Sequence, residues 1–359
     1  MMSKLPQPKP HFLAISPYIG GEAKAEGGQR LIRLASNESA IGPSPRAMQA
    51  FVEMAGQIHR YPDGASQYLR DALAEKHGLP AEQIICSNGS DAMLTMLARC
   101  FAGVGDEVIH TAHGFLMFPL AAKAAGATPV SVAENNCLAS VDNILAAITP
   151  RTTMIFLANP NNPTGTYLPF SEIERLQASL PANILLVLDG AYSEFMADVA
   201  DYNNGRALVD KGNVVLVNTF SKIFAMAALR LGWAYCPPHV ADALNRAREP
   251  FNVNAAAQIA GVAALQDEAH IKAALAQNKT VLQQTSAGLK KLGLAFHPSH
   301  ANFLLVDFGH FGAENVRLQL KNQGILVRQM GAYGLAQYLR ISMGTEEEMT
   351  IVLENLARL

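Results

Sequence analysis

The sequence predicts an α/β fold in which helices cover both faces of a mostly parallel sheet, followed by a second, smaller α/β unit. Short apolar runs rich in valine and isoleucine alternate with helical or turn segments between residues 107 and 236, which is typical of strands buried on both sides. The chain has 359 residues, half of them hydrophobic, so it is long enough for more than one folding unit with a large core.

The first 44 residues are rich in proline and glycine and contain no long periodic segment, so we expect an arm that packs on another part of the protein. Residues 45–58 and 66–78 space their apolar side chains three and four apart, which predicts two amphipathic helices. The predicted strands of the large sheet then follow: EVIHTA (107–112), TPVSVA (128–133), TTMIFLA (152–158), ILLVLD (184–189), NVVLVN (213–218) and LGWAYC (231–236).

The C-terminal third changes character after Pro237 and Pro238, where a long alanine-rich helical stretch extends to about Leu292. Three further predicted strands are interleaved with helices and indicate the smaller α/β unit: NFLLVDF (302–308), GILVRQM (324–330) and LRISMG (339–344). The acidic stretch after Gly344 is interpreted as a helix start with a capping box between Thr345 and Glu348, not as an acidic site.

Composition excludes several classes of function. The 28 Lys and Arg residues balance 30 Asp and Glu residues, so no basic excess predicts a nucleic-acid partner. The apolar runs are far shorter than the ~20 residues of a membrane-spanning helix, and the proline-rich N-terminus does not resemble a signal peptide. We expect no metal site, no disulfide and a cytoplasmic location, because four cysteines are widely separated: Cys86, Cys100, Cys137 and Cys236.

The segment TFSKIFAMAALR (219–230) directly follows a predicted strand. Lys222 has no acidic neighbour there, while Thr219, Ser221 and Arg230 supply donors that suit a phosphate. An amine beside a phosphate site is what pyridoxal phosphate needs, since the amine forms a Schiff base with the aldehyde and the donors hold the phosphate. Taken alone, however, the segment favours an ordinary exposed lysine at a strand end.

A carboxylate follows another predicted strand in ILLVLDGAYSEF. Asp189 lies at a strand end where ligands bind in open α/β sheets, and it suits the task of keeping a pyridine nitrogen protonated. Tyr192, three residues further, is placed to direct its hydroxyl to the phenolic oxygen of the cofactor. A capping or loop carboxylate remains an equal alternative for Asp189.

Two further strand ends carry weaker signals. In IFLANPNNPTG (155–165), Asn162 suits an amide donor to the same phenolic oxygen, although a simple turn explains the motif by itself. In CSNGSDAM (86–93), the free N–H groups of Gly89, Ser90 and Asp91 at a helix start suit a phosphate, although capping explains them equally well. The order of the four segments, each at a strand end, is hard to obtain by chance.

At this point the sequence resembles the fold-type I pyridoxal-phosphate aminotransferases, and among them the histidinol-phosphate aminotransferases. The resemblance covers nearly the whole chain, including SPYIGG, LASNESAIGPSP, HRYPDG, HGFLMFPLAAKAAGA and VRQMGAYGLAQYLRISMGTEEE. It implies a seven-stranded sheet in a large cofactor-binding domain at 45–250 and a small domain at 251–359. The arm at 1–44 is then expected to pack on the small domain and on the partner subunit of a homodimer.

The resemblance also implies residue roles. Lys222 would be the Schiff-base lysine and proton carrier, Asp189 the partner of the ring nitrogen, and Asn162 and Tyr192 the partners of the phenolic oxygen. The implied phosphate-binding residues are Gly89, Ser90, Asp91, Thr219, Ser221 and Arg230, with Tyr61 reaching the phosphate of the neighbouring subunit. Phe115 would stack on the ring, with His113 as a competitor, and the implied substrate-binding residues are Tyr18, Asn37, Arg328 and Arg340. A surface ion pair remains the alternative for Arg328.

The expected activity is transamination between histidinol phosphate and 2-oxoglutarate in histidine biosynthesis, with a small-molecule amino donor and a keto acid as the only partners besides a second subunit. An aromatic-amino-acid aminotransferase is the alternative, and a pyridoxal-phosphate lyase or decarboxylase comes third. A non-catalytic regulator is disfavoured because Lys222 is present. Three departures from the family pattern leave substrate identity open: SNESA, IFAMAALR and Gly190 in DGAYSEF.

Overall fold

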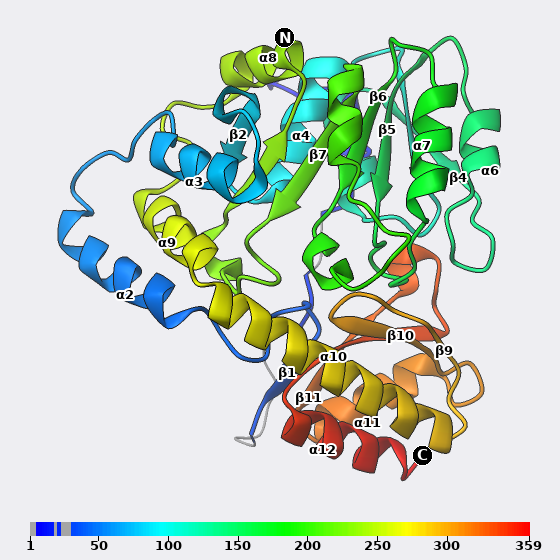
Figure 1. Ribbon diagram of the computed structural model, residues 1–359. Coiled ribbons are helices and arrows are strands. Elements are labelled where there is room, and N and C mark those ends of the chain that lie inside the picture. Colours follow the sequence, from blue (N-terminus) through cyan, green and yellow to red (C-terminus); the bar gives the residue numbers. More distant parts are fainter. Residues whose placement is uncertain (1–4, 18–19, 23–29) are drawn as a thin grey trace.

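The computed structural model describes residues 5–17, 20–22 and 30–359, and it contains two sheets (Figure 1). The larger sheet has seven strands in the order β2-β8-β7-β6-β5-β3-β4. Only β8 runs antiparallel to its neighbours, so the expected mostly parallel seven-stranded sheet is confirmed. Its strands are β2 (Ile84–Ser87), β3 (Glu107–Thr111), β4 (Thr128–Val132), β5 (Thr152–Ala158), β6 (Leu185–Asp189), β7 (Val214–Thr219) and β8 (Gly232–Tyr235).

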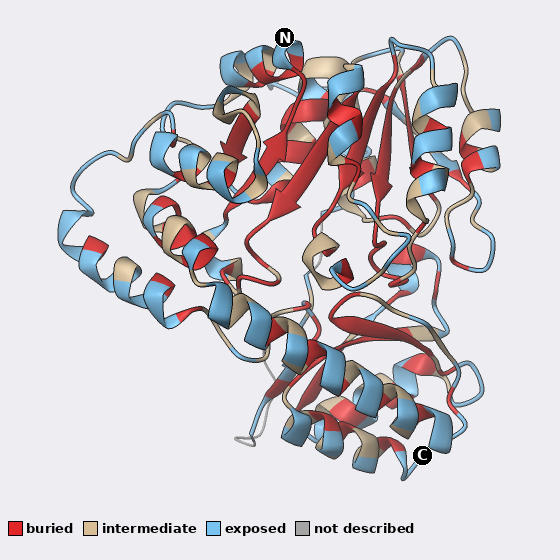
Figure 2. Cartoon of the chain, viewed as in Figure 1, coloured by how far each residue is buried: buried red, intermediate tan, exposed pale blue. Residues whose placement is uncertain are grey.

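Helices cover both faces of this sheet, as expected. Along β6, Leu186 and Leu188 belong to one buried cluster while Leu185 and Val187 belong to another, because successive side chains of a strand point to opposite faces. Figure 2 shows the buried strands between helices that turn their buried sides inward. One face packs on α3 (Gln67–His77), α6 (Val141–Ala146), α7 (Phe170–Ser179) and α9 (Ala255–Gln266), and the other on α4 (Ser90–Phe101), α5 (Met117–Ala125) and α8 (Pro238–Ala247).

The six predicted strands of the large sheet are all confirmed to within one or two residues at each end. The predicted helix at 66–78 is α3. The predicted helix at 45–58 is shorter, because α2 (Pro45–Met54) gives way to a 3₁₀ turn at Ala55–Gln57. α2 packs against α9 and not directly on the sheet.

The smaller sheet combines the arm with the C-terminal region. Its strand order is β1-β11-β12-β10-β9, and β1 pairs in parallel with β11. Sequence patterns missed β1 and β9, because strands of three and two residues are too short to give a pattern. The elements of this unit are β1 (Ile32–Leu34), β9 (Phe296–His297), β10 (Phe303–Asp307), β11 (Ile325–Gln329), β12 (Tyr338–Ser342), α11 (Ala313–Asn322) and α12 (Glu346–Leu356).

The change from one core to the other occurs inside the 24-residue helix α10 (Glu268–Lys291). Ala274 packs in the core of the large sheet, whereas Val281 and Leu289 pack in the core of the small one. The preceding α9 also belongs to the large core. A domain boundary between residues 250 and 251 would therefore separate α9 from the sheet that it covers. The packing favours a domain boundary within α10.

A local expectation near the C-terminus also has a structural counterpart. The capping box at the start of α12 is present, with Thr345 and Glu348 bonding each other's backbone N–H groups. Within the described ranges, no helix is both long and apolar enough to cross a bilayer. The same ranges contain no group of three or more His, Cys, Asp or Glu side chains that suits a metal ion.

Candidate active site

The carboxyl ends of β2, β5, β6 and β7 meet at one edge of the large sheet, and a cavity of about 280 Å³ lies there, facing the small sheet. The structure brings most of the sequence-predicted residues to its walls. These are Asn37, Ser90, Asp91, Phe115, Asn162, Asp189, Tyr192, Thr219, Ser221, Lys222, Arg230, Arg328 and Arg340.

Lys222 follows β7 by three residues and sends its amine into this cavity. The amine donates to the carbonyl oxygen of Ser36 at 3.2 Å and lies 5.9 Å from the ring centre of Tyr192. Burial lowers the pKa of Lys222 to about 8, and the positive charge of Arg340 contributes to the shift. A substantial fraction of the amine is therefore neutral near physiological pH, which is the form that attacks a carbonyl carbon.

Asp189 ends β6 and is buried. Its Oδ1 accepts a hydrogen bond from the N–H of Ala191 at 3.0 Å, and burial raises the pKa of the carboxyl to about 6. A carboxylate in such a place is stabilised by an adjacent cation. The protonated nitrogen of a pyridine ring is a cation of this kind, so Asp189 fits the pyridine end of pyridoxal phosphate.

Asn37 and Tyr192 form a hydrogen-bonded pair on the wall of the cavity. The Asn37 amide donates to the Tyr192 hydroxyl at 2.8 Å, which leaves the proton of that hydroxyl to donate elsewhere. Burial raises the pKa of Tyr192, so the group stays a donor at neutral pH. Asn37 itself is held by Ser342 of β12, whose hydroxyl accepts from the Asn37 backbone N–H at 2.8 Å.

The opposite end of the cavity suits an anion. Helix α4 begins there after Gly89, whose φ is +82°, and no side chain caps its first N–H groups. A Cβ on Gly89 would lie 2.6 Å from the Arg230 guanidinium, so this glycine lets the cation approach the helix start. Arg230 lies 3.2 Å from Asp91, while Thr219 donates to Ser221 at 3.0 Å. Free N–H groups, a guanidinium and hydroxyls together fit a phosphate.

Two arginines of the small sheet line the cavity. Arg328 on β11 and Arg340 on β12 are directly opposite each other in the antiparallel register. Arg340 is only 5% exposed. It donates to the Asn162 side-chain oxygen and, at 2.8 Å, to the carbonyl oxygen of Ala35.

Three sequence-predicted residues are not on these walls. Gly89 lies just behind the wall, at the start of α4. Tyr61 is 84% exposed and stacks on Phe251, with ring centres 4.7 Å apart; it lines a separate cavity of about 870 Å³ that shares Arg230 with the first. Tyr18 lies outside the described residues.

Phe115, and not His113, lines the cavity. The His113 ring instead contacts the carbonyl oxygen of Tyr333 through Nδ1, at 2.7 Å. Sequence reasoning missed several other wall residues. Tyr333 is buried in a short 3₁₀ turn that gives no pattern. Glu38 is charged and pairs with Arg33 at 2.8 Å, and the others have no side chain or a small one: Gly20, Gly21, Ala35, Ser36, Ala158, Pro160, Ala191 and Ala227.

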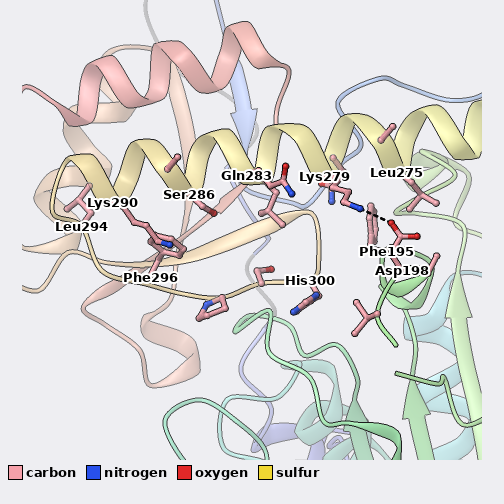
Figure 3. Close-up of a pocket in the computed structure, with 18 of the residues that line it drawn as sticks. Phe195, Asp198, Leu275, Lys279, Gln283, Ser286, Lys290, Leu294, Phe296 and His300 are labelled. Carbon is pink, nitrogen blue, oxygen red and sulfur yellow. Dashed lines mark hydrogen bonds and ion pairs between the residues drawn. The ribbon is translucent and has the colours of Figure 1, made fainter. Parts of the chain in front are cut away.

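A larger groove of about 1150 Å³ runs along α10 (Figure 3). It contains none of the sequence-predicted residues. Lysine side chains of the helix and apolar groups such as Phe195 and Phe296 form its walls, and Lys279 bridges to Asp198 at 2.8 Å. Its polar groups do not converge as those around Lys222 do.

Comparison of the whole chain with known proteins shows its family. The chain belongs to the family described as aminotransferase class I and II, whose model matches residues 29–356. It is 52% identical over 354 residues to the histidinol-phosphate aminotransferase of Rhodospirillum centenum and 51% identical over 355 residues to that of Paramagnetospirillum magneticum, with 98% of every chain covered. The crystal structure of the Sinorhizobium meliloti histidinol-phosphate aminotransferase in complex with pyridoxal-5'-phosphate superimposes with a TM-score of 0.91 at 28% identity, covering 100% of this chain and 98% of that one.

Proposed function

We propose that this protein is a pyridoxal-phosphate-dependent aminotransferase that transfers the amino group of histidinol phosphate to 2-oxoglutarate. The observation that carries the proposal is the pair Arg328 and Arg340, opposite each other on the substrate side of the cavity that holds the Lys222 amine. One pocket must accept a phosphate monoester and a carboxylate in turn, and two guanidinium groups suit both anions. The relatives named histidinol-phosphate aminotransferase support the same substrate.

The residues around the cavity fit pyridoxal phosphate at four points. Asp189 would hold the ring nitrogen, Asn162 and Tyr192 would hold the phenolic oxygen, and Phe115 would cover a face of the ring. The first N–H groups of α4, together with Thr219, Ser221 and Arg230, would hold the phosphate. When bound, the cofactor supplies an electron-withdrawing ring that takes up the electron pair from the substrate Cα.

The side chains around the cavity then have distinct roles in the reaction. Lys222 anchors the cofactor through its amine and afterwards moves the proton from the substrate Cα. Asp189 keeps the ring nitrogen protonated. Arg340 and Arg328 hold the anionic end of the substrate so that its Cα faces the Lys222 amine. The same groups serve both halves of a ping-pong cycle, in which the amino group is first taken from the donor and then given to 2-oxoglutarate.

We further propose a homodimer in which each active site uses Tyr61 of the neighbouring subunit. Tyr61 is exposed and does not line the cavity of its own chain, although it borders a second cavity that reaches Arg230. Ile58 is exposed and lines that second cavity with Tyr61, and the nearby helices α2 and α9 carry further exposed apolar side chains: Met48, Phe51, Val52 and Ile259. Such a patch marks a protein interface. A cytoplasmic location agrees with the four free thiols.

Subunit mixing tests the shared site. A heterodimer of Tyr61→Phe and Lys222→Ala subunits carries both defects in one site and leaves the other site intact. We expect mixing to restore activity above that of either parent. Absence of recovery, with heterodimers confirmed by mass spectrometry, would show that Tyr61 acts within its own subunit or not at all.

The substrate assignment is tested by comparing amino donors in the first half-reaction, followed through the visible absorbance of the cofactor. We expect kcat/KM for histidinol phosphate to exceed that for phenylalanine and tyrosine. A preference for the aromatic donors would make the protein an aromatic-amino-acid aminotransferase. Release of ammonia or carbon dioxide, in place of simple conversion of the donor's amino group to an oxo group, would make it a lyase or a decarboxylase.

A further inference from the structure

Gly21 of the N-terminal arm packs so closely on the rest of the site that no side chain fits. A Cβ at this position would lie 2.9 Å from the Ala35 Cβ, 3.0 Å from the Ala35 carbonyl oxygen and 2.8 Å from the Ser36 hydroxyl. These separations are shorter than carbon atoms tolerate without displacement of a neighbour. Gly20 and Gly21 both line the cavity, so this contact places the arm on the cavity wall.

The segment beneath Gly21 also accepts hydrogen bonds from two cations of the site. The Ala35 carbonyl accepts from Arg340 at 2.8 Å, and the Ser36 carbonyl accepts from Lys222 at 3.2 Å. This segment is fixed at both ends, because β1 pairs with β11 before it and Asn37 is bound to Ser342 after it. A side chain at position 21 would therefore displace the arm and leave the two cations in place.

A second contact holds the arm one residue further along. The Glu22 carboxylate lies 2.8 Å from Arg317 and 3.0 Å from Lys321, both on α11. Arg317 is only 15% exposed and also pairs with Glu314. An ion pair with a mostly buried guanidinium and a second cation is stronger than an isolated surface pair. Gly21 and Glu22 thus fasten adjacent residues of the arm to the small domain.

We propose that the contacts of Gly21 and Glu22 hold the N-terminal arm in place, so that residues 20–21 form the wall of the cavity on the substrate side. This wall then sets the affinity for the anionic amino donor. The proposal rests on the proposed function, because it takes the donor to occupy this cavity. When the arm is held in place, this wall keeps water from the anion bound by Arg340, and a charge-assisted hydrogen bond is stronger where water is excluded. Gly21 and Glu22 are positioning residues, since they act through the wall and through Arg340.

Matched glycine substitutions test this contact. Gly21→Ala forces the arm from Ala35, whereas a Cβ on Gly331, which is exposed and does not line the cavity, meets no atom within 4 Å. Binding of succinate, a dicarboxylate that does not react, is measured by calorimetry on the cofactor-loaded protein. We expect Gly21→Ala to raise the dissociation constant about tenfold, a factor equal to about 1.4 kcal/mol, and Gly331→Ala to leave it within about twofold, which is about 0.4 kcal/mol.

A second pair of variants tests the ion pairs. Glu22→Gln and Glu314→Gln each remove one carboxylate partner of Arg317, but only Glu22 belongs to the arm. We expect the dissociation constant of succinate to rise about threefold in Glu22→Gln, in the range of a partly exposed pair, and to stay at the wild-type value in Glu314→Gln.

The half-reaction with glutamate distinguishes loss of the wall, which weakens binding alone, from a general structural defect, which also lowers the rate. Gly21→Ala should raise the glutamate concentration that gives half the maximal rate. The maximal rate itself and the pH titration of the cofactor absorbance should stay near wild type, because Lys222 keeps its carbonyl partner. Equal effects of Gly331→Ala and Gly21→Ala, equal effects of Glu22→Gln and Glu314→Gln, or a loss of maximal rate with unchanged binding would each contradict the proposed role of Gly21 and Glu22. A wild-type preference for aromatic donors would overturn only the substrate assignment, and succinate binding would still decide the role of Gly21 and Glu22.

Discussion

The two sides of the cavity are built in different ways. On the cofactor side, Asp189 and Thr219 end neighbouring strands of one sheet that is buried on both faces. On the substrate side, Arg340 lies on a strand of the small sheet and is held by the carbonyl of Ala35 from the arm and by Asn162 from the large domain. One side is fixed by a single sheet, and the other is assembled from three separate parts of the chain.

This difference assigns different tasks to the two sides. Burial on the cofactor side shifts the pKa values of Lys222 and Asp189, which is what proton transfer requires. The substrate side presents two guanidinium groups whose charge does not change with pH. We therefore expect substitutions on the cofactor side to stop the chemistry and substitutions on the substrate side to change selectivity.

The largest effect is expected at Lys222. Lys222→Ala should retain pyridoxal phosphate without a covalent link and lose turnover by about 10⁴-fold or more, because both the covalent anchor and the proton-carrying amine are gone. The exposed Lys279→Ala is the control. Turnover and the visible spectrum of both variants are the measurements. Near-wild-type turnover in Lys222→Ala would remove this residue from the mechanism.

Asp189→Asn should have the next largest effect. A neutral amide does not hold the ring nitrogen protonated, so proton removal at Cα should slow by about 10²–10⁴-fold while the cofactor stays bound. Single-turnover absorbance with saturating glutamate measures this step directly. A rate within threefold of wild type would mean that Asp189 only supports the turn at Ala191.

On the substrate side, Arg328→Ala should discriminate between the two donors. A phosphate monoester offers more acceptor oxygens and more charge than a carboxylate, so losing one of two guanidinium groups should weaken histidinol phosphate more than glutamate, by about 1–3 kcal/mol. The ratio of the two kcat/KM values measures the difference, with the adjacent Gln329→Ala as control. Equal losses for both donors would favour the aromatic alternative, which needs only Arg340.

The pKa shift of Lys222 predicts a pH dependence of stability in the cofactor-free protein. The folded-state pKa of about 8 lies below the ordinary value of 10.5, so between these values the unfolded chain binds more protons. Stability contributed by this group therefore rises as pH increases from about 8 to 10.5. Lys222→Met should remove that rise, which thermal unfolding at several pH values measures. An identical pH profile in the variant would contradict the burial of the amine.

The sequence predicted the cofactor side more completely than the substrate side. Asp189, Asn162 and Lys222 follow predicted strands, and the carboxyl ends of parallel strands must meet at one edge. The substrate side gave no comparable pattern. Ser36 takes part through a backbone carbonyl, and Gly21 through the absence of a side chain. Contacts between segments that are distant in sequence leave no local periodicity, so the arginine pair rested on resemblance.

The smallest effect is expected where the cofactor side departs from the family sequence, in IFAMAALR. Ala225 has a φ of +56°, a conformation that costs a residue with a Cβ about 1–2 kcal/mol, while glycine avoids this cost but loses about 0.5–1 kcal/mol of backbone entropy. Ala225→Gly should therefore raise the free energy of unfolding by about 0.5–1 kcal/mol. The exposed Ala228, in a 3₁₀ turn with no positive φ, is the matched control, and Ala228→Gly should lower stability. Urea unfolding of both variants measures the difference. A loss of stability in Ala225→Gly equal to that in Ala228→Gly would mean that the loop after Lys222 carries no strain.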